Sequence, residues 1–170
     1  IPLPYTGSMP NAQAVTQGPD GNMWAVVGLY SGAGNGPTPG SILKVTPSGA
    51  ATTVGSFSRT GCELDCGIVT GADGNLWFSG AGNGVTRITT AGTQSSFRVA
   101  TATCCANPNG ITAGPDGNVW FVDPANGIGR VATGRGTAIP VPAKSVIGAP
   151  VIALEATRRG TSATITVLPG

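Results

Sequence analysis

One seven-residue segment occurs three times in the chain, as GPDGNMW at 18–24, GADGNLW at 71–77 and GPDGNVW at 114–120. The aspartates of the three copies lie 53 and then 43 residues apart. A period near 43 residues leaves room for about four short strands, which is typical of the blades of a β-propeller. The repeat therefore constrains the architecture before it says anything about chemistry.

Each copy predicts the same order of strands. In the third unit we expect strands at 110–114, 118–122, 128–133 and 137–142, and in the second unit at 67–71, 75–79, 85–90 and 94–100. The first two strands of a unit meet at Asp-Gly, where glycine takes a positive φ and aspartate bonds the local backbone. The three tryptophans are expected to pack between neighbouring blades. The structural residues of the repeat are Asp20, Gly21, Trp24, Asp73, Gly74, Trp77, Asp116, Gly117 and Trp120.

The composition agrees with an all-β chain rather than a disordered one. Glycine (28 residues) and proline (14 residues) make up about a quarter of the 170 residues, but 40% of the chain is hydrophobic. That share of apolar residues is enough to form a core, so the glycines and prolines indicate many tight turns.

The prediction is a single domain over 1–170, a β-propeller of about four blades with four antiparallel strands each. The blades cover about 11–58, 66–101 and 109–144, and a partial blade combines 145–170 with 1–6. In this arrangement strands from both termini close the last blade, which hides its edges. A competing possibility is a short helix at 151–160, where Glu155 and Arg159 are four residues apart. The first unit is longer because of its connection at 28–40, and such an insertion often carries function.

The charges and the longest apolar run argue against nucleic acid and against membrane insertion, respectively. Charged residues make up 9% of the chain and the net charge is +2, with the lysines and arginines scattered. A surface that follows nucleic-acid phosphates needs more positive charge, so nucleic acid is not an expected partner. The longest apolar run, 145–154, is interrupted by Gly148 and Pro150, which predicts no membrane insertion.

Four cysteines lie in two connections between units, in GCELDCG and TCCANPNG. Cys62 and Cys105 are 43 residues apart, one repeat period, so they are expected in neighbouring loops on one face. We predict disulfides from loop to loop, Cys62 with Cys104 or Cys105 and Cys66 with the other. A tetrathiolate zinc site is the alternative, although adjacent cysteines fit it poorly. The chain starts at Ile1 rather than Met, and it is rich in Thr, Ser, Asn and Gly. Together with the cysteines, these features favour a secreted or cell-surface protein. The alternative is a chain that was shortened at its N-terminus.

The segment ITAGPDGNVWFVDPANGIGRVATGRGTAIPVP resembles the repeat of the virginiamycin B lyase family, which is related to NHL-type propellers. The resemblance covers residues 1 to about 144. The resemblance implies a propeller fold. The enzyme that gives the family its name is a seven-bladed lyase, which opens a cyclic streptogramin antibiotic with the help of Mg²⁺ and of His and Glu side chains. This chain contains no His. An acid commonly follows the second strand in the family, and only Asp123 keeps one among the matching positions Val27, Gly80 and Asp123.

Propeller topology places the cysteine loops, the 28–40 connection and Asp123 on one face. The candidate binding residues there are Tyr30, Arg59, Glu63, Asp65 and Asp123. We expect a noncatalytic module that binds a protein or glycan or assembles with copies of itself, with no metal and no cofactor. The first alternative is a propeller enzyme, either a lyase of the streptogramin type or another carboxylate- and metal-dependent enzyme, and Asp123 is its weak catalytic candidate. The second alternative is a fragment of a longer propeller.

Overall fold

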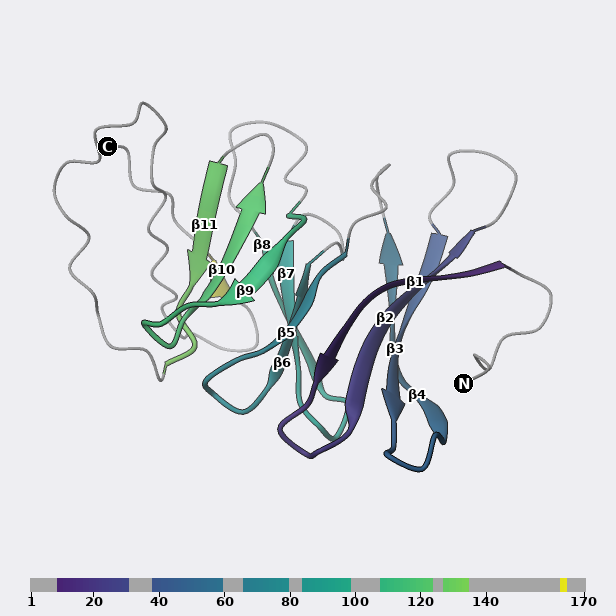
Figure 1. Cartoon of the computed structure of the whole chain (residues 1–170). Helices are drawn as coiled ribbons and strands as arrows, with labels where there is room; N and C mark the ends of the chain where they lie inside the picture. The colour runs from purple at the N-terminus through teal and green to yellow at the C-terminus, as the bar shows by residue number, and fades with distance from the viewer. Residues whose placement is uncertain are drawn as a thin grey trace, which may run out of the picture.

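The computed structural model describes residues 9–30, 38–59, 66–79, 84–98, 108–123, 127–134 and 163–164 (Figure 1). All regular secondary structure in these ranges is β-strand, which confirms the predicted all-β class. No helix that could cross a membrane is found among them.

The strands form three separate sheets, and in each sheet the strands lie in chain order. The first sheet contains β1 (Met9–Gln17), β2 (Met23–Tyr30), β3 (Thr38–Val45) and β4 (Ala51–Arg59). The second contains β5 (Ile68–Thr70), β6 (Leu76–Ser79), β7 (Gly84–Ile88) and β8 (Gln94–Arg98). The third contains β9 (Ile111–Ala113), β10 (Val119–Asp123) and β11 (Gly127–Val131). All these neighbours are antiparallel, and the four strands of the second unit and the first three of the third lie where the repeat predicts them.

One short strand departs from the prediction. Ala163–Thr164 (β12) pairs in parallel with Phe97 and Arg98 of β8, so it extends the second sheet instead of starting a fourth. The predicted strands at 1–6 and 137–142 and the alternative helix at 151–160 lie outside the described residues.

The first hairpin turn of each sheet is formed in the same way. In the first sheet the Gly21 N–H donates to the Gly18 carbonyl (3.2 Å) and the Gly18 N–H donates to the Asn22 carbonyl (2.7 Å). Gly21 has a φ of 77°, and its counterparts Gly74 and Gly117 each have a φ of 73°. Side chains other than hydrogen rarely tolerate this conformation, which explains the glycine after each repeated aspartate. The positive φ predicted for these glycines is confirmed.

The sheets pack face to face, and the alternation of side chains along each strand gives every sheet two different faces. We call the face that carries the repeated tryptophan the tryptophan face and the other the back face. Between the first two sheets the core consists of Trp24, Val26, Ile42, Phe57, Cys66, Ile68, Leu76, Phe78 and Ile88. Between the second and third sheets it consists of Trp77, Val85, Val119, Phe121 and Val131. In both cases the tryptophan face of one sheet covers the back face of the next.

The sheets also share an orientation. The first strands of the sheets are neighbours, with β1 against β5 and β5 against β9, and Thr70 Oγ1 donates to the Gln17 carbonyl between the first two. The turns between β1 and β2, between β5 and β6 and between β9 and β10 lie toward the lower side of Figure 1, and we call this side the turn edge. Strands β2, β4, β6, β8 and β10 end at the opposite edge, which we call the loop edge. The second sheet is covered on both faces, whereas each outer sheet has one face turned away from it.

Candidate functional site

Each repeated aspartate holds the tryptophan four residues later. The indole Nε1 donates to the carboxylate Oδ1 over 3.0 Å from Trp24 to Asp20, 3.0 Å from Trp77 to Asp73 and 2.9 Å from Trp120 to Asp116. The intervening asparagine donates its Nδ2 to the carboxylate Oδ2 over 2.9, 2.8 and 2.8 Å in the three units, and its backbone N–H to Oδ1. The sequence predicted a turn role for the acid but not its bond to the indole.

The first glycine of each repeat makes room for this contact. A Cβ on Gly18 would lie 2.4 Å from Trp24 Cδ1, and one on Gly114 would lie 2.3 Å from Trp120 Nε1. Both distances are far shorter than a carbon contact allows. The glycine at the start of GPDGN is therefore required by the indole ring that lies over it.

A cation lies opposite each tryptophan on the neighbouring strand. The register pairs Trp24 with Lys44, Trp77 with Arg87 and Trp120 with Arg130. Lys44 Nζ lies 5.8 Å from the centroid of the Trp24 ring, and Arg130 Cζ lies 5.7 Å from that of Trp120, within the range of cation–π attraction.

The same cations reach the repeated acids in the outer sheets. Lys44 Nζ is 3.7 Å from Asp20 Oδ2, and Arg130 Nη1 is 3.5 Å from Asp116 Oδ2, whereas Arg87 Nη2 donates to Ser95 Oγ over 3.5 Å. Sequence reasoning missed these cations. In the second and third units the arginine follows its tryptophan by ten residues, but the longer connection of the first unit moves Lys44 twenty residues from Trp24.

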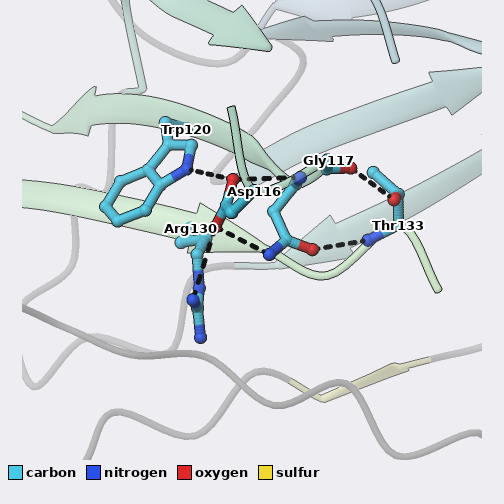
Figure 2. A network of polar contacts seen from close by, with 6 residues as sticks. Asp116, Gly117, Trp120, Arg130 and Thr133 are labelled. Carbon is cyan, nitrogen blue, oxygen red and sulfur yellow. Dashed lines mark hydrogen bonds and ion pairs between the residues drawn. The ribbon is translucent and has the colours of Figure 1, made fainter. Parts of the chain in front are cut away.

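The third unit carries the most enclosed of these clusters (Figure 2). Asp116 is 1% exposed and Asn118 is 5% exposed. Asn118 Oδ1 also accepts the Thr133 N–H over 3.4 Å, and Thr133 Oγ1 donates to the Gly117 carbonyl over 2.7 Å. The residues that follow β11 are thereby attached to the turn between β9 and β10.

Hydrogen bonding decides the acidity of two of the acids. Burial raises the pKa of Asp116, but the bonds from Trp120 and Asn118 and the charge of Arg130 lower it, and the net pKa lies below its usual value. Burial likewise raises the pKa of Asp20, and the bonds from Trp24 and Asn22 outweigh it, so this pKa is also lowered. Both groups therefore remain carboxylates at neutral pH and act as hydrogen-bond acceptors.

The predicted binding residues share an edge where they are described. Tyr30 ends β2, Arg59 ends β4 and Asp123 ends β10, so all three backbones reach the loop edge. Asp123 is 3% exposed, which places its carboxylate inside the molecule rather than on a contact surface. Glu63 and Asp65 lie outside the described ranges.

Cys66 lies in the core between the first two sheets and is 3% exposed. Cys62, Cys104 and Cys105 are not among the described residues, so the predicted pairing of loops by disulfides stays a prediction. The described part of the chain contains no group of three or more His, Cys, Asp or Glu residues that could hold a metal ion.

The tryptophan face of the third sheet carries a shallow apolar hollow of about 350 Å³. Trp120 and Val122 of β10 line it together with Ile128 of β11 and the residues Gly110–Thr112 around β9. Val122 is 45% exposed and Ile128 is 51% exposed. The hollow is therefore lined by apolar side chains that are open to solvent.

Comparison with known proteins gives one distant structural similarity to report. No family model matches the sequence, and no curated protein matches it. Among solved structures, a protein of unknown function from Bacteroides caccae shares 15% sequence identity, with a TM-score of 0.45. The match covers 75% of this chain and 44% of that one, so the chain spans less than half the length of that protein.

Proposed function

We propose that the chain is a noncatalytic β-propeller module of the virginiamycin B lyase-like, NHL-related type, which acts outside the cell and binds a protein or glycan at its loop edge. Three sheets of one repeat, stacked face to face with their first strands β1, β5 and β9 in sequence, support a radial arrangement about an axis. The loop edge is favoured because its connections vary between units while the turn edge repeats.

The observation that carries the noncatalytic assignment is the use of the acids. Asp20, Asp73 and Asp116 each accept an indole N–H on one carboxylate oxygen and an asparagine amide on the other, so both oxygens serve the turn. Asp123 is the remaining acid among the described residues, and its side chain is buried. The chain also has no His, and imidazole is the commonest general base.

An activity assay tests the noncatalytic assignment. The purified chain is incubated with a type B streptogramin and Mg²⁺, and ring opening is followed by mass spectrometry. We expect no product above the rate without protein. Product that forms with the chain and disappears with Asp123→Asn would overturn the assignment and establish a carboxylate-dependent lyase.

A binding screen tests the loop edge. The full chain is applied to arrays of glycans and of extracellular proteins, together with Tyr30→Ala, Arg59→Ala and the control Ala91→Lys. Ala91 is exposed in the turn between β7 and β8, on the turn edge. We expect the loop-edge variants to lose binding to the same spots and the control to keep it. Equal loss in the control, or no bound spot at all, would refute the proposal.

A further inference from the structure

The tryptophan face of the third sheet is exposed, whereas the same face of the other two sheets is buried. The register makes three positions equivalent: the tryptophan, the residue two positions later, and that residue's partner on the next strand. They are Trp24, Val26 and Ile42 in the first sheet, Trp77, Ser79 and Val85 in the second, and Trp120, Val122 and Ile128 in the third. The first six are at most 1% exposed, but Val122 and Ile128 are about half exposed and Trp120 is half-buried.

The other described positions of this face are open as well. Thr112 of β9 lies opposite Trp120 and is exposed, and Gly110, whose carbonyl accepts the Val122 N–H, is also exposed. Arg130 of β11 is half-buried. The hollow of about 350 Å³ lies on this open face. Its volume is at the lower end of the range of about 300–1,000 Å³ found for ligand sites in proteins, so side chains of a partner can enter it.

The two buried tryptophan faces show which side chains fit against this surface. We call each contact between neighbouring sheets a joint. In both joints the covering strand presents an aliphatic residue and, two positions later, a phenylalanine, with an isoleucine paired opposite the phenylalanine. These residues are Leu76, Phe78 and Ile68 in the first joint and Val119, Phe121 and Ile111 in the second. The molecule itself therefore shows that a strand with the pattern aliphatic–x–Phe covers a tryptophan face.

This chain carries no further strand with that pattern. Its four phenylalanines all belong to the two joints; they are Phe57, Phe78, Phe97 and Phe121. At the positions equivalent to Leu76 and Phe78 the first sheet has Met23 and Ala25, so a second copy of the chain does not offer the pattern there either. Exposed apolar side chains that lie together mark a contact with another protein, and here the matching surface has to come from a different one.

We propose that the tryptophan face of the third sheet is a docking site for an extended segment of a partner protein, which presents an aliphatic residue and a phenylalanine two positions apart. The phenylalanine ring enters the hollow against Trp120, Val122 and Ile128, as the rings of the two joints lie against the equivalent positions. This site is separate from the loop edge, and it does not rest on the function proposed there.

The charges at the site favour an uncharged segment. Arg130 is the charged residue among the described positions of this face, and it already lies over Trp120 and beside the Asp116 carboxylate. Covering the face therefore leaves no new unpaired ion, which would be costly, and the partner needs no acid to balance the arginine. A charge placed by mutation among the apolar side chains should oppose binding.

A peptide copied from the covering strands of the first joint tests the site. The probe has the sequence of residues 67–79, GIVTGADGNLWFS, with a fluorescent label and with a cysteine added at each end. A disulfide between the added cysteines keeps the two strands paired and lowers the entropy that binding costs. Fluorescence anisotropy with the full chain should show saturable binding with a Kd below about 1 mM. A control probe with Leu76→Ser and Phe78→Ser keeps the turn and should bind at least about tenfold more weakly.

Variants of the full chain locate the bound probe. Ile128→Asp and Val122→Asp should each weaken binding at least about tenfold, because the carboxylate would lose its water beneath an apolar ring. The matched control is Ala91→Asp, which adds the same charge in an exposed turn of the second sheet and should leave the Kd unchanged. Both test positions are about half exposed, so the substitutions should leave the fold intact, as circular dichroism can verify.

Several outcomes would overturn the proposal. Absence of binding at 1 mM of the full chain, equal binding of the serine probe, or equal binding by Ile128→Asp would each show that the face does not take this pattern. Light scattering distinguishes a second copy as the occupant: a native dimer that Ile128→Asp converts to a monomer would also refute the docking of a different partner. If the probe does not bind and Ile128→Asp lowers Tm, other residues of this chain hold the face.

The test is independent of the loop-edge screen. Tyr30→Ala and Arg59→Ala should bind the probe as the native chain does, and Ile128→Asp should keep the spots that the native chain binds on the arrays. Loss of the probe without loss of the spots, or the reverse, therefore shows which of the two proposals has failed.

Discussion

Asparagine in place of aspartate at position 116 should destabilise the protein far more than the same change at the equivalent position 20. Both carboxylates accept an indole N–H and an asparagine side chain at nearly equal distances. They differ in burial, because Asp116 is 1% exposed while Asp20 is an exposed residue. The pair of variants therefore separates the effect of burial from the effect of the contacts.

The size of the effect follows from the lost oxygen. In Asp116→Asn an amide nitrogen replaces the oxygen that accepts from Asn118 Nδ2 over 2.8 Å and from Arg130 over 3.5 Å, so donors face donors. A buried hydrogen bond to a charged group contributes about 1.5–3 kcal/mol to the free energy of unfolding. At Asp20 solvent replaces the lost partner, and the expected cost is below about 1 kcal/mol.

Thermal unfolding followed by circular dichroism at pH 7 measures the difference. For a chain of this size 1 kcal/mol lowers Tm by roughly 2–4 °C, so Asp116→Asn should lose about 5–10 °C and Asp20→Asn about 3 °C or less. Urea titrations with unchanged slopes would show that both variants unfold from the same compact state. Equal losses of Tm would refute the reasoning that burial of the third cluster controls its energetic weight.

Three further predictions concern pH, the core and the thiols. The pKa values of Asp20 and Asp116 are lowered in the folded state, so the stability that they contribute is present above their ordinary value of 3.8 and is lost as pH falls below it. Urea midpoints between pH 6 and pH 3 should show this fall, and Asp116→Asn should flatten it. Phe78→Ala removes a ring that is 0% exposed between the first two sheets, and we expect a loss of about 3–5 kcal/mol in urea unfolding; a loss under about 1 kcal/mol would contradict the core assignment. Intact mass before and after reduction should rise by two hydrogens for each of the two predicted bridges, and an unchanged mass would reject them.

The strands and turns were predictable because their signals are local. Asp-Gly fixes each first turn, and the apolar alternation that follows it sets the strands. The cross-strand pairs were not predictable in the same way. Which cation lies opposite Trp24 depends on how many residues the connection between β2 and β3 contains, and the sequence alone does not give that register.

The burial of individual acidic side chains could not be predicted from the sequence either. Asp20, Asp73 and Asp116 occupy identical motifs, yet Asp116 is 1% exposed whereas Asp73 is half-buried and Asp20 is exposed. Asp123 illustrates the same limit from the functional side. Propeller topology predicted it on a candidate binding face, whereas the alternation of β10 directs its side chain inward.

The order of strands within the sheets has a consequence for biosynthesis. Every pairing in the three sheets, apart from the short β12, joins strands that are adjacent in the chain. Each unit can therefore complete its strand pairing once its own strands have emerged from the ribosome, before the next unit has emerged. A gene rearranged so that translation starts between two units would cut no strand pair, and its product should assemble the same three sheets.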